Sequence, residues 1–218
     1  MKVFVVGAAG RVGGLLARSL QDRGDAVSGL VRRAEQGETL RAAGIEPRFG
    51  DLTTLSPAGL AELVGDADAI VFTAGAGGAG REATTAIDGD GARTAVEAAR
   101  IAGVDRFVLV SVFPEAWRER DLGPDFDHYI AVKKDADVTL TRSGLDWIIL
   151  RPAALLDEPG RGTVALGPAQ IHETVTRQDV ADTLAALLHE PRISRQILEL
   201  TGGDTPILDA VRANIRRS

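Results

Sequence analysis

The first twenty residues, MKVFVVGAAGRVGGLLARSL, predict how the chain begins to fold. Residues 2–6 form a short apolar run rich in β-branched side chains, which is typical of a strand buried on both faces of a parallel sheet. From Val12 onward, apolar side chains recur at helical spacing. Between the two elements lie glycines 7, 10 and 13. The order of strand, glycine turn and helix predicts the first unit of an α/β fold.

Each glycine of this turn has a physical role in binding a phosphorylated ligand. Gly7 lets the chain turn sharply, Gly10 lets the backbone approach a pyrophosphate, and Gly13 lets the helix pack closely on the strand. The start of the helix offers unpaired N–H groups and the positive end of its dipole to the anion. The spacing is G-x-x-G-x-x-G rather than G-x-G-x-x-G. A glycine turn that binds nothing is the alternative, but the position between strand and helix favours a dinucleotide.

The remaining sequence continues the alternation of strands and helices. Strands are expected at 26–32, 45–50, 69–72, 106–110, 146–151 and 196–200, and helices at 35–43, from Ser56-Pro57, and at 84–102, 127–143, 178–189 and 206–216. Ser56 before Pro57 and Thr176 before Asp179 have the spacing of helix caps. Glycines 89 and 91 interrupt the helix expected at 84–102.

This alternation implies right-handed crossovers and a parallel sheet. We therefore predict a single Rossmann-type α/β domain over residues 1–218, with a doubly wound parallel sheet and helices on both faces. A small C-terminal extension is expected on the substrate side, where residues 152–195 would form a lid.

Composition argues against several classes of function. The chain is 44% hydrophobic and 26% charged, which is ordinary for a globular protein. Its net charge is −6 and it has no basic run, so nothing in its charge indicates a surface for nucleic acid or an anionic membrane. The absence of cysteine excludes disulfides and thiol nucleophiles, and histidines 128, 172 and 189 lack metal-ligand spacing, so no metal is expected. No targeting segment or run of about 20 apolar residues is present. A cytoplasmic enzyme acting on a small molecule, either a monomer or a homodimer, is the default expectation.

The end of the second expected strand favours NADP over NAD. An NAD site usually places an acid here, which accepts hydrogen bonds from the ribose hydroxyls. This chain has Leu30-Val31-Arg32-Arg33 instead, and two guanidiniums suit a 2′-phosphate. Arg11, inside the glycine turn, could join them. The alternative is that these are solvated arginines in an arginine-rich chain, and NAD stays possible.

Tyr129 and Lys133 lie four residues apart on an expected helix and so share a face. A lysine ammonium near a phenol lowers the pKa of that phenol, so Tyr129 could exchange a proton at neutral pH while hydride moves to or from a carbonyl carbon. Ser111, at the end of the strand 106–110, could hydrogen-bond the same oxygen. Y-x-x-x-K is a weak pattern, but Tyr129 is the only tyrosine and Lys133 one of three lysines. An amphipathic packing pair is the alternative.

The chain resembles the short-chain dehydrogenase/reductase superfamily, and within it the atypical NAD(P)H-binding, NmrA-like and flavin-reductase-like branch. The resemblance covers nearly the whole chain in order. It is carried by the segments 5–13, 30–33, 50–52, 88–92, 103–111, 129–133 and 143–152.

The resemblance implies further roles. Asp51 would contact the adenine, residues 73–75 would line the cofactor, and Pro152 would approach the nicotinamide. One departure is that Val112 and Phe113 follow Ser111, where a second serine is common. The predicted catalytic residues are Ser111, Tyr129 and Lys133, and the predicted cofactor contacts are Gly7, Ala9, Gly10, Arg11, Val12, Gly13, Arg32, Arg33, Asp51, Leu52, Thr73, Ala74, Gly75, Ser111, Lys133 and Pro152.

Three functions are open at this point. The first is an NAD(P)H-dependent reductase of a small carbonyl, quinone or flavin-like substrate, which Tyr129 and Lys133 favour. The second is a non-catalytic redox sensor that contacts a protein partner. The third is a sugar-nucleotide epimerase or dehydratase, which the short segment after Pro152 disfavours. Trp117, in the loop 114–124, could stack on a flat substrate or only fill the lid, and His172 is expected at the pocket rim.

Overall fold

A computed structural model describes residues 1–115, 117 and 120–216 of the chain. Its strands are β1 (Lys2–Val6), β2 (Ala26–Val31), β3 (Glu46–Phe49), β4 (Ala69–Phe72), β5 (Arg106–Val110), β6 (Asp146–Pro152), β7 (Ala154–Leu156), β8 (Thr163–Gly167), β9 (Thr174–Thr176), β10 (Gln196–Gly202) and β11 (Thr205–Pro206). Its helices are α1 (Arg11–Asp22), α2 (Ala34–Ala42), α3 (Pro57–Val64), α4 (Arg81–Thr84), the π-helix η1 (Thr85–Gly91), α5 (Ala92–Ala102), α6 (Pro124–Thr141), α7 (Arg177–Leu188) and α8 (Ile207–Ala213).

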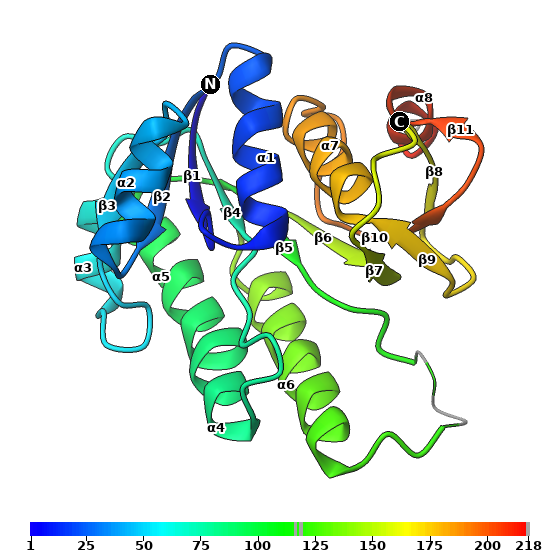
Figure 1. Cartoon of the computed structure of the whole chain (residues 1–218), viewed down its shortest axis with the longest axis horizontal. Coiled ribbons are helices and arrows are strands. Elements are labelled where there is room, and N and C mark those ends of the chain that lie inside the picture. The colour runs from blue at the N-terminus through cyan, green and yellow to red at the C-terminus, as the bar shows by residue number, and fades with distance from the viewer. Residues whose placement is uncertain (116, 118–119, 217–218) are drawn as a thin grey trace.

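One large sheet organises the described part of the chain (Figure 1). Its strand order is β11-β8-β10-β6-β5-β4-β1-β2-β3, and β7 and β9 pair separately. From β3 to β10 every neighbouring pair is parallel, whereas β8 runs antiparallel to β10. The predicted Rossmann-type class is therefore confirmed. The chain order reverses at β1, between β2 and β4, and such a switch point opens a crevice at the carboxyl ends of the strands.

Helices cover both faces of this sheet. One hydrophobic cluster joins the sheet to α1, α2, α7 and α8, and the other joins it to α3, α5 and α6. In Figure 1, α1 and α7 lie on one side and α5 and α6 on the other. Ser56 and Thr176 cap α3 and α7 as expected, because their hydroxyls accept hydrogen bonds from the N–H groups of Gly59 and Asp179. In the described part of the chain, no helix combines the length and apolar character needed to cross a membrane.

Two regions differ from the sequence-based expectation. The helix expected at 84–102 begins as a π-helix, and its glycines allow close packing there. A Cβ at Gly89 would lie 3.1 Å from Val132 Cγ1, and a Cβ at Gly91 would lie 2.7 Å from Leu52 Cδ2. The segment after Pro152 also contains four short strands, β7, β8, β9 and β11, that its sequence pattern does not predict.

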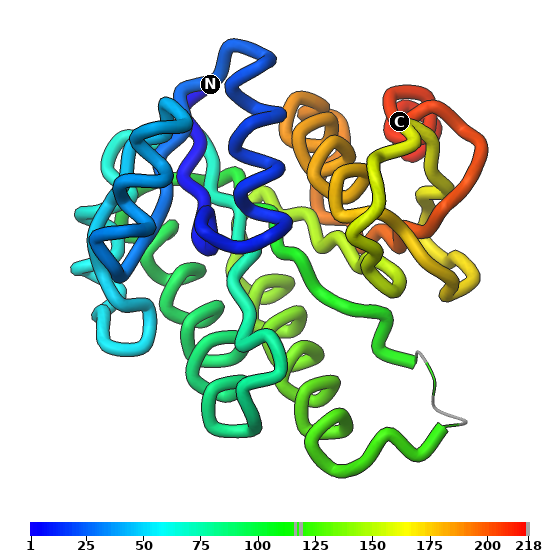
Figure 2. Tube along the Cα trace, in the orientation of Figure 1, coloured from blue at the N-terminus to red at the C-terminus, as the bar shows by residue number. Residues whose placement is uncertain are grey.

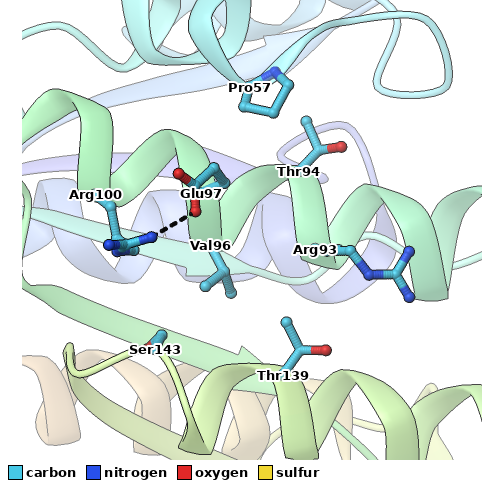
Figure 3. A pocket seen from close by; sticks show the side chains of 8 residues that line it. All are labelled: Pro57, Arg93, Thr94, Val96, Glu97, Arg100, Thr139 and Ser143. Atoms are coloured by element: carbon cyan, nitrogen blue, oxygen red, sulfur yellow. Dashed lines mark hydrogen bonds and ion pairs between the residues drawn. The ribbon is translucent and has the colours of Figure 1, made fainter.

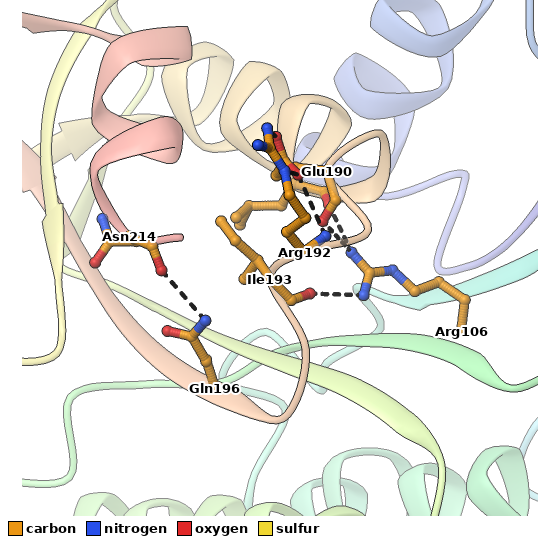
Figure 4. A network of polar contacts seen from close by, with 7 residues as sticks. Arg106, Glu190, Arg192, Ile193, Gln196 and Asn214 are labelled. Atoms are coloured by element: carbon orange, nitrogen blue, oxygen red, sulfur yellow. Dashed lines mark hydrogen bonds and ion pairs between the residues drawn. The ribbon is translucent and has the colours of Figure 1, made fainter. Parts of the chain in front are cut away.

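A buried arginine joins β5 to the end of α7 (Figure 4). Arg106 is 8% exposed, and its guanidinium donates to Asp146 at 2.9 Å and to the carbonyls of Ile193 at 2.8 Å, Leu187 at 2.7 Å and Glu190 at 3.2 Å. These carbonyls lie at and beyond the end of α7, where no further helical turn supplies donors. Arg106 therefore holds α7 in place over the sheet.

Candidate active site

One cavity of about 1140 Å³ opens along the carboxyl ends of the parallel strands. Figure 2 shows the trace running away from the sheet after β5 and entering α6 at a distance from it. The described residues of this excursion are 111–115, 117 and 120–123. Residues from this excursion and from α6 line one end of the cavity, and residues that follow β1, β2 and β3 line the other. The cavity is lined by these predicted site residues: Gly7, Ala9, Gly10, Arg11, Val12, Arg32, Asp51, Leu52, Thr73, Ala74, Gly75, Ser111, Tyr129, Lys133 and Pro152. Gly13 and Arg33 are not among the lining residues.

The glycine turn has the geometry that its sequence predicts. Gly7 has a φ of 97°, and a Cβ there would lie 2.6 Å from the backbone nitrogen of Ala74. A Cβ at Gly13 would overlap the carbonyl oxygen of Gly7, so this glycine allows close packing and lies behind the cavity wall. Gly10 begins α1 without a side-chain cap. The first N–H groups of α1 are therefore available to an anion.

The end of the cavity beside β2 carries one arginine and one acid. Arg32 is exposed, lines the cavity and makes no salt bridge in the ranges that the structure describes. Asp51 Oδ1 accepts hydrogen bonds from the hydroxyl and N–H of Thr53, at 2.7 and 3.0 Å. These bonds, together with the charge of Arg32, hold the pKa of Asp51 below its usual value. Within the described residues no group donates a hydrogen bond to the second oxygen of Asp51, so Asp51 still has an acceptor for a ligand.

Arg33 points elsewhere. It is the N-cap residue of α2, and its Nε lies 3.9 Å from Glu35 Oε2. Successive side chains of extended backbone point to opposite sides, so only one of the two neighbouring arginines can face the cavity. The structure brings Arg32 to the predicted site and leaves Arg33 at the surface.

Lys133 is held in a buried network that includes an acid the sequence analysis missed. Its Nζ donates to the carbonyl of Val110 at 2.8 Å and lies 3.5 Å from Asp88 Oδ1. Asp88 is 2% exposed, and its Oδ2 accepts from the N–H of Ala76 at 2.9 Å. Asp88, on the π-helix, therefore links the glycine-rich loop after β4 to Lys133. The only signal in the sequence is its place at the head of the segment Asp88-Gly89-Asp90-Gly91.

The prediction that Lys133 lowers the pKa of Tyr129 is wrong. The pKa of Tyr129 is raised well above its ordinary value of 10.0. The larger cause is burial of the phenol, and the smaller cause is the negative charge of Asp88. Burial also lowers the pKa of Lys133, against the opposing charges of Asp88 and Asp137. Tyr129 is therefore a neutral hydroxyl at physiological pH and not a phenolate.

Ser111 presents a buried hydroxyl to the cavity. The residue is 3% exposed, and its Oγ has no hydrogen-bond partner in the part of the chain that the structure describes. Buried hydroxyls in folded proteins normally have a partner. A ligand in the cavity would supply the missing partner for Ser111.

Five rings form a continuous wall at the α6 end of the cavity, which we call the aromatic wall: Phe113, His172, Trp117, Phe126 and Tyr129. In this order, successive ring centroids lie 5.0, 4.7, 6.2 and 6.3 Å apart. Trp117 thus lies at the site as expected, and His172 packs edge-on against it. Residues 116, 118 and 119 of the predicted loop 114–124 lie outside the described residues.

Asp157 bridges two arginines at the cavity. Asp157 lies 3.0 Å from Arg11 and 2.7 Å from Arg177, and both arginines line the cavity. Arg11 is 70% and Asp157 65% exposed, so their pair contributes at most about 1 kcal/mol. Arg11 can therefore exchange this partner for a phosphate at little cost. Arg177, at the start of α7, is a further cationic residue that the sequence analysis missed.

A smaller cavity of about 370 Å³ lies between α3, α5 and α6 (Figure 3). It shares no lining residue with the first cavity. Its two arginines are already paired on their own helical segment, Arg100 with Glu97 and Arg93 with Asp90.

Comparison with known proteins agrees with this geometry. The family described as NAD(P)H-binding matches residues 7–191. The chain belongs to this NAD(P)H-binding family. The match includes the glycine turn, Asp88, the aromatic wall and the start of α7, so the family extends over both ends of the cavity.

Individual relatives match the chain over nearly its whole length. The protein named uncharacterized sugar epimerase YhfK of Bacillus subtilis is 40% identical over 214 residues, which cover 97% of this chain and 99% of that protein. A provisionally assigned NAD-dependent epimerase/dehydratase from Bacillus halodurans has a TM-score of 0.89 at 34% identity, covering 98% and 99% of the two chains. ChuY, an anaerobilin reductase from Escherichia coli O157:H7, has a TM-score of 0.81 at 26% identity, covering 94% and 98%. The two solved structures share the architecture of this chain, and the three relatives carry names of different reactions.

The raised pKa of Tyr129 can be measured directly, because no other tyrosine is present in the chain. We expect the ultraviolet absorbance of phenolate to appear only above pH 10, because burial and Asp88 both oppose ionisation. In Asp88→Asn the midpoint should fall, since one of the two causes is removed, but it should stay above 10. Asp90→Asn, which changes an exposed acid on the same helix, should leave the midpoint unchanged. Ionisation of wild-type Tyr129 below pH 10 would contradict this description of the site.

Proposed function

We propose that the protein is an NADP(H)-dependent oxidoreductase that transfers hydride between the nicotinamide and a small carbonyl, quinone or flavin-like acceptor. One observation carries the proposal. A single cavity joins the glycine turn and Arg32 at one end to Ser111, Tyr129 and the aromatic wall at the other. A dinucleotide with its phosphates at the glycine turn would lie along this cavity, with an acceptor beyond it.

The residues present fit such a dinucleotide. The uncapped start of α1 suits the diphosphate, and a Cβ at Gly7 would have no room. Arg32 suits a 2′-phosphate, because its guanidinium can donate two parallel hydrogen bonds and has no salt-bridge partner in the described ranges. Ser111 Oγ lacks a partner where the nicotinamide end would lie. When bound, the reduced nicotinamide supplies the hydride, two electrons with one hydrogen nucleus.

The chain's own residues act on the acceptor through hydrogen bonds. The hydroxyls of Ser111 and Tyr129 can donate to the acceptor oxygen, where negative charge develops as hydride arrives. Tyr129 does this as a neutral donor, because its pKa is raised. The second proton that the reduced acceptor needs comes from solvent at the open cavity. Lys133 is a positioning residue, since its ammonium is directed to Val110 and Asp88.

The name of the Bacillus subtilis relative suggests sugar epimerisation as a second activity. That reaction begins with removal of a proton from a sugar hydroxyl, for which a tyrosine with a lowered pKa is suited. The raised pKa of Tyr129 and the apolar character of the aromatic wall both oppose that role. These two observations support reduction of an acceptor over oxidation of a sugar.

The preference for NADP depends on one of two neighbouring arginines. Arg32→Ala should weaken binding of NADPH about 10- to 100-fold, the loss expected for one charge-assisted contact to the 2′-phosphate. Its affinity for NADH should change little. Arg33→Ala is the matched control and should bind both cofactors as the wild type does. Calorimetric titrations of the three proteins measure these affinities. Equal losses of NADPH affinity in the two variants, or none in either, would contradict the assignment of Arg32.

Turnover tests the reaction itself. We expect the purified protein to oxidise NADPH with members of a panel of quinones, flavins, aldehydes and ketones, and not with UDP-glucose. Tyr129→Phe should lower kcat/KM by no more than about tenfold, the loss of one neutral hydrogen bond. A tyrosine that transfers the proton itself would cost about 10²-fold or more. Tight binding of NADPH without any turnover would contradict the proposed enzymatic activity and support a redox sensor.

A further inference from the structure

Most of the aromatic wall lies outside the structural core, although Phe113 belongs to one of the two hydrophobic clusters. Trp117, Phe126 and Tyr129 belong to neither of the two hydrophobic clusters, although all three line the cavity. Only 4% of the chain is aromatic, and the large aromatic side chains are just six Phe, two Trp and one Tyr. Four of these nine therefore gather at one end of one cavity. Core packing accounts for Phe113 but not for Trp117, Phe126 and Tyr129, so a ligand is the better explanation for these three.

The backbone at Trp117 supports the same conclusion. Its φ of 56° lies in the left-handed region, which a bulky side chain rarely adopts. Such strain persists only where the surroundings hold it, and it concentrates at functional sites. Here the carbonyl of Trp117 accepts from the N–H of Arg120 at 2.8 Å, and the guanidinium carbon of Arg120 lies 5.6 Å from the indole centroid. Arg120 thus helps to hold the indole at the cavity against the preference of the Trp117 backbone.

The neighbouring rings hold the indole in one orientation. The ring plane of His172 is nearly perpendicular to that of Trp117, at 81°, and to that of Phe113, at 76°. Phe126 is tilted by 39° from Trp117 and comes from a different element, α6. Three separate segments therefore meet to place these rings: the loop after β5, α6 and the segment between β8 and β9.

The aromatic wall lies where an acceptor must bind. Arg32 and Asp51 follow β2 and β3, at one edge of the sheet, whereas Ser111 follows β5 on the other side of the switch point. A dinucleotide that runs from Arg32 past the glycine turn reaches Ser111 with its nicotinamide. The space beyond Ser111 is bounded by Trp117, Phe126 and His172.

We propose that this space selects a planar, conjugated two-electron acceptor of the quinone type, which lies against the faces of Trp117 and Phe126; the proposal rests on the function proposed above. The acceptor takes a hydride from NADPH and one proton from solvent, which yields the hydroquinone and NADP⁺. A flat conjugated ring gains offset or edge-on ring contacts with the wall, beyond the burial of its area. A saturated carbonyl compound such as cyclohexanone has no flat conjugated ring and cannot make these ring contacts.

The test uses menadione as a planar probe and cyclohexanone as a saturated one. Each is titrated calorimetrically into the wild-type protein saturated with NADP⁺, so that no reduction occurs, and each is then assayed with NADPH. We expect menadione to bind at least tenfold more tightly than cyclohexanone. Trp117→Leu should weaken menadione binding about five- to tenfold and raise its KM, with kcat changed much less.

Three further variants make the test specific. Trp117→Phe keeps an aromatic face and should retain most of the affinity, whereas Phe126→Leu, on α6, should lose affinity as Trp117→Leu does. Phe49→Leu changes an exposed ring outside the cavity and should have no effect. Equal affinity for both probes, or an unchanged affinity in both leucine variants of the wall, would overturn the proposal. If the protein binds NADPH but prefers cyclohexanone, only this inference is overturned. If it binds no NADPH, the proposed function itself is overturned.

Discussion

The site depends on how closely the start of α1 approaches the end of β1. A Cβ at Gly13 would overlap the carbonyl oxygen of Gly7, and a Cβ at Gly7 would press on the backbone that follows β4. Because glycine has no Cβ at either position, the end of β1, the start of α1 and the backbone after β4 lie at van der Waals distance from one another. The first N–H groups of α1 then face the cavity without a side chain to cap them. The same contact sets the position of the whole cavity, since β1 is the strand at which the order of the sheet reverses.

At the Tyr129 end of the cavity, burial determines how the charged groups are paired. Asp88 and Lys133 are both almost fully buried, and each supplies the charge that the other needs. Asp88 also holds the backbone of the glycine-rich loop through Ala76, so one carboxylate connects this loop, the lysine and the phenol. Since Tyr129 stays neutral, the site is suited to donating hydrogen bonds to an oxygen that gains charge. This arrangement supports the proposed reduction of an acceptor.

Local patterns predicted much of this description, and long-range packing accounts for what they missed. The glycine turn, the caps Ser56 and Thr176 and the buried parallel strands depend on neighbours in the sequence, and the structure has them where they were expected. The π-helix was not predicted, because its irregularity depends on how Gly89 and Gly91 pack against α6 and Leu52. The predicted direction of the pKa shift of Tyr129 was wrong. The sequence shows that Tyr129 lies four residues from Lys133, but it shows neither the burial of the phenol nor the nearness of Asp88. The aromatic wall could not be assembled in advance, since its rings come from three distant segments.

Binding of NADPH to Gly10→Ala tests most directly whether the bare turn holds the diphosphate. Gly10 has extended backbone, with φ of −81° and ψ of 169°, and an added Cβ would lie 3.0 Å from the nearest atom, the Gly7 carbonyl oxygen, so the variant should fold. Its unfolding midpoint should fall by no more than about 4 °C, the cost of alanine at a helix N-cap. Calorimetry should nevertheless show at least a tenfold loss of NADPH affinity, because the methyl group stands where the phosphates approach. Wild-type affinity in this variant would contradict the account.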